Sequence, residues 1–121
     1  MSYVDGFVAA VPTANRDAYV TMAKRACAVF LKNGATRVVE NWGDDVPHGK
    51  QTDFFRAVEA KPEETVVFSW VVWPSKDARD TGWKAVMADP EMQPSAMGNV
   101  FDGKRLIYGG FATLLDESAR A

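Results

Sequence analysis

Two segments half a chain apart share one design, and this repeat restricts the fold more than any other feature of the sequence. FVAAVPTANRDAY at 7–19 is an apolar run that ends at Pro12, and FSWVVWPSKDARDTGW at 68–83 is an apolar run that ends at Pro74; an Arg–Asp pair follows each. Proline cannot donate a hydrogen bond to a β-ladder, so it ends each predicted strand. The offset of about 62 residues, half the chain, predicts a duplicated strand–helix unit.

Helix signals follow each proline. Thr13 or Asn15 in the first unit, and Ser75 in the second, are suitable N-cap residues. The predicted helices cover about 15–33, before a glycine, and about 76–88, before an Asp–Pro pair. Apolar residues at helical spacing predict which side chains each helix buries. These are Tyr19, Met22, Ala26, Val29 and Phe30 in the first helix, and Trp83, Val86 and Met87 in the second.

Strand patterns complete the order β-α-β-β-α-β. The predicted strands are 3–11, 36–42, 65–73 and 105–115, the last entered through an Asp–Gly turn. This order predicts an α+β, ferredoxin-like fold with both helices on one face of an antiparallel sheet. We expect residues 1–121 to form a single domain of this kind.

The strand at 65–73 is apolar on both of its faces, although a sheet covered on one side only usually alternates apolar and polar residues. An uncovered apolar face favours aggregation, so we expect a second copy of the chain to cover it and form a homodimer, sheet to sheet. The two sets of side chains are Val66, Phe68, Trp70 and Val72 on one face, and Val67, Val71 and Trp73 on the other.

Composition excludes several classes of protein. The net charge of −2 and the pI of about 5.3 argue against binding to nucleic acid. The single cysteine, Cys27, cannot form an internal disulfide, which fits a reducing cytoplasm, and an inert, buried thiol is expected there. The longest apolar run, 66–73, is too short to span a membrane, and the N-terminus does not resemble a signal peptide. We therefore expect a soluble cytoplasmic protein.

Four short motifs resemble one protein family. They are YVDGFV at 3–8, EETVVFSW at 63–70, MADPEM at 87–92 and FDGKRLIYGGF at 101–111, and the last is the most specific. Together they extend over nearly the whole chain and resemble the DUF1428 family of bacterial YbaA-like proteins. That family resembles the dimeric α/β barrel superfamily, in which two ferredoxin-like subunits join their sheets. The superfamily includes cofactor-free monooxygenases, haem-using enzymes, muconolactone-type isomerases and members that only bind ligands, so the resemblance implies a fold and leaves the activity open.

Two carboxylates occupy unusual places in the predicted strands. Asp5 shares its strand face with Tyr3 and Phe7, and Glu40 shares its face with Trp42 and an apolar neighbour. A carboxylate buried among aromatic rings without a partner has a raised pKa and can act as a general base. The structural alternative is that each carboxylate reaches solvent or a backbone amide near the strand end.

His48 is the third weak catalytic candidate. It lies in a turn-rich segment, 43–53, that also carries Asp44, Asp45 and Asp53. Histidine and carboxylates can supply acid–base chemistry, but Gly, Asp and Pro are also ordinary turn residues. Because it is the only histidine, a multi-histidine metal site is excluded, and no metal is expected.

Aromatic residues and one arginine complete the predicted ligand site. Arg105 and Lys104 are adjacent and point to opposite faces of a strand, so only Arg105 points inward, toward a carboxylate or a ligand. Gly109–Gly110 predicts a bulge or a close approach of another backbone. We expect a pocket between helices and sheet, or at the barrel mouth, lined by some of Tyr3, Asp5, Trp42, Trp70, Arg105 and Tyr108.

Two hypotheses for function follow. The first is an enzyme that acts on a small organic molecule without a tightly bound cofactor. The second is a non-catalytic module that binds a small ligand or a protein, because the sequence has no phosphate loop, histidine cluster or nucleophile–base pair. RNA binding is disfavoured by the charge.

Overall fold

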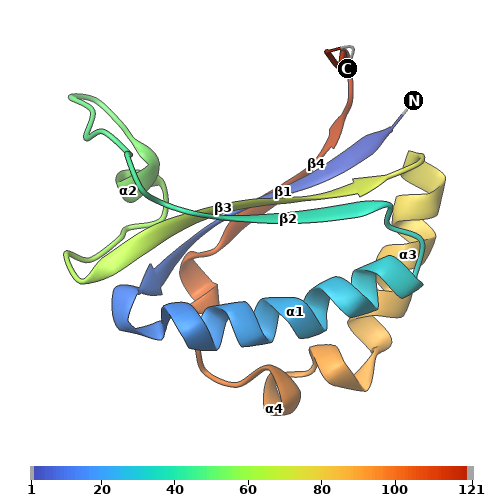
Figure 1. The fold of residues 1–121 in the computed structure, drawn as a ribbon, viewed down its shortest axis with the longest axis horizontal. Helices are drawn as coiled ribbons and strands as arrows, with labels where there is room; N and C mark the ends of the chain where they lie inside the picture. The colour runs from blue at the N-terminus through green and yellow to red at the C-terminus, as the bar shows by residue number, and fades with distance from the viewer. Residues whose placement is uncertain (1, 120–121) are drawn as a thin grey trace.

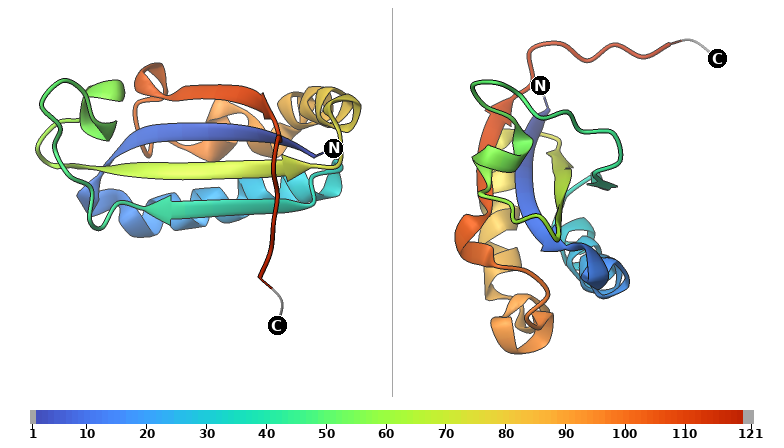
Figure 2. Two further views of the ribbon diagram at one scale, coloured as in Figure 1. Left: turned by 90° about the horizontal axis from the view of Figure 1, so that it is seen from above. Right: turned by 90° about the vertical axis from the view of Figure 1, so that its left-hand side faces the viewer.

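A four-stranded antiparallel sheet with two long helices against one face forms the framework of the computed structural model, which describes residues 2–119 (Figures 1 and 2). The strands lie in the order β2-β3-β1-β4. This confirms the α+β, ferredoxin-like prediction. The elements are β1 (Tyr3–Pro12), α1 (Arg16–Lys32), β2 (Arg37–Trp42), α2 (Phe54–Ala57), β3 (Glu64–Trp73), α3 (Lys76–Ala88), α4 (Pro94–Met97) and β4 (Ile107–Ala112). No helix within residues 2–119 is both long enough and apolar enough to cross a bilayer.

The two repeated units begin their helices differently. Ser75 caps α3 as predicted, because its side chain accepts a hydrogen bond from the Ala78 amide at 3.1 Å. Before α1 the chain makes a short 3₁₀ turn, Thr13–Asn15, and neither residue caps α1 through its side chain. The side chain of Asn15 instead donates to the carbonyl of Val100 at 2.8 Å, which ties the start of α1 to the segment before β4.

The register of β1 and β3 separates two faces of the sheet. Asp5 is paired with Val71 and Phe7 with Ser69, and these side chains lie on the face that α1 and α3 cover, called here the helix face. The other face, called the open face, carries Phe68 and Phe111 among its side chains. Both faces of β3 are apolar, as predicted.

The open face is covered in part by the chain itself, which the sequence did not indicate. The segment 43–63, called here the α2 loop, folds over one end of this face (Figure 1). Its Val58 is 1% exposed and packs with Ala10 and Val66. The rest of the face remains uncovered: the exposed fractions are 45% for Phe68, 44% for Ile107 and 62% for Phe111.

The final strand is shorter than predicted. It begins at Ile107 rather than at 105, because Asp102 caps a 3₁₀ turn that includes Arg105. The predicted bulge at Gly109–Gly110 is absent, because the β1–β4 ladder is regular there, and the close neighbour of Gly110 is a side chain rather than another backbone. A side chain at Gly110 would collide with the ring of Tyr3.

Helix α3 packs closely on the core. Val86 is fully buried, whereas Met87 was expected to be buried and is 59% exposed, because it lies at the edge of the cavity described below. Helix propensity alone predicts that Gly82 weakens α3. In the structure Gly82 is buried, and an added Cβ would collide with the ring of Trp73 and the carbonyl oxygen of Asn33.

We therefore expect Gly82→Ala to destabilise the fold. Alanine improves helix propensity by about 1 kcal/mol, but overpacking costs about 1–3 kcal/mol, and contact with a backbone oxygen and a buried ring leaves little room to relax. Urea unfolding should show a lower midpoint. Gly103→Ala is the control, because nothing lies within 4 Å of an added Cβ there; a variant at position 82 as stable as this control would contradict the close packing.

Candidate functional site

A cavity of about 340 Å³ lies between the helix face of the sheet and the helices α1 and α3. This volume is within the range typical of sites for small molecules. Its walls are mainly aromatic rings and methionine side chains. The rings that line it include Phe7, Phe30, Trp83, Phe101 and Tyr108.

The rings of the cavity are arranged in a row because of strand and helix geometry. Phe7 on β1 is the register partner of Tyr108 on β4, and their rings stack at 6.4 Å between centroids. Phe7 also stacks with Trp83 of α3 at 6.2 Å, and Trp83 lies 5.5 Å from Phe30 of α1. Rings stacked in this way offer flat surfaces, which suit a flat apolar ligand.

Glu40 supplies the carboxylate of this cavity. The β2–β3 register places it beside Ser69, and the hydroxyl of Tyr19 donates a hydrogen bond to its Oε1 at 2.7 Å. Burial raises the pKa of Glu40, and hydrogen bonds from Tyr19 and Ser69 offset part of that rise. Burial, and next the charge of Glu40, also raise the pKa of Tyr19, so this phenol stays protonated and donates.

Glu40 faces a second space as well. Glu40, Tyr19 and Val38 also line an outer hollow of about 330 Å³ between α1 and β2, together with Lys24 and Cys27. Two spaces adjoin Glu40, so the residue as a whole is exposed. Protein nevertheless surrounds much of its carboxylate, and this burial raises the pKa. Burial, and then Glu40, raise the pKa of Cys27, which keeps this thiol protonated. Glu40 is thus in contact with both the cavity and the solvent.

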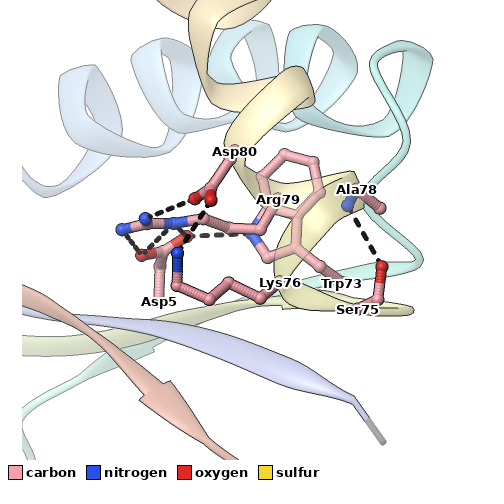
Figure 3. Close-up of polar contacts among 7 residues, drawn as sticks. All are labelled: Asp5, Trp73, Ser75, Lys76, Ala78, Arg79 and Asp80. Carbon is pink, nitrogen blue, oxygen red and sulfur yellow. Dashed lines mark hydrogen bonds and ion pairs between the residues drawn. The ribbon is translucent and has the colours of Figure 1, made fainter.

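Asp5 has a structural partner that lies 74 residues away (Figure 3). Its side chain is buried, with the residue 2% exposed, and it accepts hydrogen bonds from Trp73 Nε1 at 2.9 Å and from Arg79 Nη2 at 2.8 Å. Arg79 also binds Asp80 at 3.0 Å and lies over the ring of Tyr3. Asp5 and Tyr3 therefore belong to an ion-pair cluster that anchors α3, and they do not line the cavity.

Arg105 is engaged with a carboxylate as well. Its Nη1 and Nη2 each donate to Glu64 at 2.7 Å, and Nη1 also donates to the carbonyl of Glu59 in the α2 loop. The hydrogen bonds from Arg105 are the main reason that the pKa of Glu64 falls to about 2. Arg105 therefore ties the start of β4 to the α2 loop, and it does not line the cavity.

The other predicted site residues are scattered. Tyr108 lines the cavity, whereas Trp42 packs near Tyr19 and borders a shallow hollow at the end of β2. Trp70 lies on the open face, 5.4 Å from the ring of Phe68. His48 is an exposed surface residue whose ring stacks on a phenylalanine of α2, away from the cavity. Within residues 2–119 no group of three or more His, Cys, Asp or Glu side chains could hold a metal ion.

Sequence reasoning missed Ser69 and the polar role of Tyr19. Tyr19 was counted only as part of the apolar stripe of its helix, and Ser69 was not considered. One signal was present, since Ser69 is the only polar residue of FSWVVW. The register that sets Ser69 opposite Glu40 depends on strand pairing, which the sequence does not specify.

Two solved structures share the fold of a four-stranded antiparallel sheet with two long helices on one face. SnoaB, a cofactor-independent oxygenase from Streptomyces nogalater, was solved as a mutant and is similar with a TM-score of 0.58 and 18% identity, over 95% of each chain. Rv0793 from Mycobacterium tuberculosis is similar with a TM-score of 0.53 and 12% identity, over 98% of this chain and 100% of that one. At these identities the likeness shows the fold alone.

The chain belongs to the DUF1428 family. Residues 2–103 match the family described as "Protein of unknown function (DUF1428)". The proteins called "Uncharacterized protein YbaA" in Escherichia coli K12 and in Shigella flexneri are each 52% identical to it over 117 residues, which is 97% of this chain and 100% of theirs. The resemblance inferred from the four motifs is confirmed.

The ion-pair cluster can be tested separately from the cavity. We expect Asp5→Asn to destabilise the fold by about 3 kcal/mol, because removing one partner leaves a poorly compensated charge; Arg79 keeps Asp80, which limits the loss. Chemical denaturation measures the change, with Asp45→Asn on the surface turn as control. Equal stability of the two variants would show that Asp5 does not anchor α3.

Proposed function

We propose that this protein binds a small, flat, largely apolar molecule in the cavity and takes a proton from it through Glu40. The observation that carries the proposal is the position of this carboxylate, which lines an aromatic cavity and whose pKa is raised. A raised pKa makes the carboxylate a stronger base, closer to the neutral range in which general bases work best.

The lining of the cavity indicates the kind of ligand. No Lys or Arg side chain lines it among the described residues, so an anionic ligand would lose its hydration without gaining a countercharge. A neutral molecule with an acidic hydroxyl fits better. Its rings can lie along Phe7 and Trp83, and its hydroxyl can donate to Glu40.

The residues around Glu40 support a complete path for the proton. The proton passes from the ligand hydroxyl to the carboxylate of Glu40, and the ligand becomes an oxyanion. The hydrogen bond from Tyr19 holds the carboxylate in place. Water in the outer hollow then accepts the proton, because Glu40 borders that space too. Only a proton moves in this step: Glu40 and Tyr19 come from the chain, and solvent water is the final acceptor.

Two other functions can be distinguished from proton transfer by experiment: reaction of the bound ligand with oxygen, and ligand binding without chemistry. An electron-rich oxyanion can react with oxygen, and SnoaB is described as a cofactor-independent oxygenase; oxygen consumption with a bound hydroxyarene would place this chain in the same reaction class. The alternative is a module that binds a ligand without chemistry. Such a module would keep its ligand affinity, and the emission of its bound ligand, when Glu40 is replaced by glutamine.

A fluorescent hydroxyarene tests the role of Glu40 without knowledge of the natural ligand. 2-Naphthol is flat and apolar, and its hydroxyl becomes strongly acidic on excitation, so bound molecules beside a base emit as naphtholate. We expect naphtholate emission from the complex with excess protein. It should decline as the pH falls through the pKa of Glu40, above the ordinary range for glutamate, because a protonated carboxyl cannot accept a proton.

The matched variants are Glu40→Gln and Glu63→Gln, the second on an exposed turn. Glu40→Gln should bind naphthol with similar affinity but emit from the neutral form, with a similar melting temperature, and Glu63→Gln should behave as wild type. Naphtholate emission that persists in Glu40→Gln would refute the proposal.

A homodimer through the open face is the second part of the proposal. The uncovered side chains on that face include Phe68, Ile107 and Phe111, and a second copy placed sheet to sheet would bury them. The ferredoxin-like fold resembles that of the dimeric α/β barrel superfamily, in which two such subunits join their sheets. This supports an assembly in which the two open faces meet.

We expect Phe68→Asp to give a monomer, since it would place an unpaired charge in an apolar interface. Sedimentation velocity at micromolar concentration measures the mass. Leu31→Asp is the matched control, because Leu31 is 48% exposed on α1 and lies away from the open face. A wild-type protein that sediments as a monomer, or a Phe68→Asp dimer, would exclude this interface.

A further inference from the structure

The chain after β4 carries two leucines that nothing in the described chain covers. Leu114 is 91% exposed and Leu115 is 75% exposed. A backbone hydrogen bond from Thr113 to the carbonyl of Ser2 fixes the point where this segment leaves the sheet. Residues 113–119, called here the C-terminal arm, then stand off the sheet on the side away from α1 and α3 (Figures 1 and 2). Adjacent apolar side chains in this position suit burial against another surface.

The shape of the open face limits how a second copy can cover it. The α2 loop stands over one end of the face, and the C-terminal arm leaves from the opposite end (Figure 1). If a two-fold axis ran along the strands, the two α2 loops would meet at the same end and keep the sheets apart. An axis across the strands instead places each α2 loop over the free end of the partner. Each arm then lies beside the α2 loop of the other copy.

The hollow at the end of β2, which Trp42 borders, lies at that place beside the α2 loop. Phe54 is 46% exposed and its ring lies 6.0 Å from the ring of Phe68. Both border a hollow of about 270 Å³ at the junction of the α2 loop and the open face. Exposed rings around a concave surface can bury aliphatic side chains such as leucine, which removes apolar area from water.

Charges on the two segments favour one direction for the arm. Asp116 and Glu117 follow the two leucines. Asp44 and Asp45 line the hollow, whereas Arg56 of α2 lies outside its lining, 4.0 Å from Asp53. The acidic end of the arm is therefore repelled from these two aspartates and points away from them.

We propose that the C-terminal arm of one copy packs Leu114 and Leu115 into the hollow beside Phe54 and Phe68 of a second copy. The exchange is reciprocal, so each hollow receives the arm of the other chain. The inference rests on the dimer of the proposed function and adds to it a segment and a receiving surface.

Removal of the leucines tests the energetic role of the arm. We expect the double variant Leu114→Ser/Leu115→Ser, and a chain that ends at Ala112, to dimerise about tenfold more weakly or worse in sedimentation equilibrium, because burial of apolar side chains drives association. Leu31→Ser is the control, because it makes the same substitution at an exposed position of α1, and it should not alter the affinity of the dimer. Thermal melts of the monomeric fraction confirm that each variant is folded.

A disulfide tests the contact itself. In a Cys27→Ser background, the double variant Leu115→Cys/Phe54→Cys should oxidise to a dimer joined by two disulfides, each between position 115 of one copy and position 54 of the other. The two single variants are the controls and should not form this doubly linked dimer. A disulfide within one chain would show that the arm folds back on its own sheet and would overturn the inference. A wild-type dimer that is unaffected by loss of the leucines would overturn the arm and leave the sheet interface standing. A monomeric wild type would refute both.

Discussion

The central strands β1 and β3 are apolar on both faces, and most of the remaining structure serves to cover them. Their ten-residue antiparallel pairing places Ala9, Val11, Val67 and Val71 under the helices, while Phe68 and its neighbours face the other way. The helix face is closed by α1 and α3 except at the aromatic cavity. The open face is closed at one end by the α2 loop, and a second copy with its C-terminal arm is our proposal for the rest. The proposed assembly would thus follow from the composition of two strands.

The two carboxylates of the helix face, Asp5 and Glu40, lie in different surroundings. At one end Asp5 is held by Trp73 and Arg79, so this buried carboxylate is fully engaged in anchoring α3. Farther along the sheet, Glu40 has only hydroxyl donors near it and keeps a raised pKa. Asp5 is held by Trp73 and Arg79 and does not line the cavity, whereas Glu40 lines it. This difference is why the chemistry is assigned to Glu40 and stability to Asp5.

Several features of the fold followed from local patterns. Pro12 and Pro74, the helix spacing and the Gly34 stop predicted the order and approximate bounds of the four strands and the two long helices, because each signal acts through neighbouring residues. The α2 and α4 helices escaped prediction, since four residues carry too little periodicity. Met87 was assigned to the core by its spacing, but the position lies at a cavity edge.

From sequence alone, parity placed Asp5 and Glu40 on strand faces shared with aromatic side chains and left their burial open, and periodicity placed Tyr19 on the inner side of its helix. The sequence also determined that both faces of β3 need cover. Only the tertiary structure decided which carboxylate meets Arg79 and which meets Tyr19, and that Ser69 lies opposite Glu40. The physical reason is that local patterns fix the direction of a side chain, whereas its partner comes from strand register and helix packing between residues 21 to 74 positions apart.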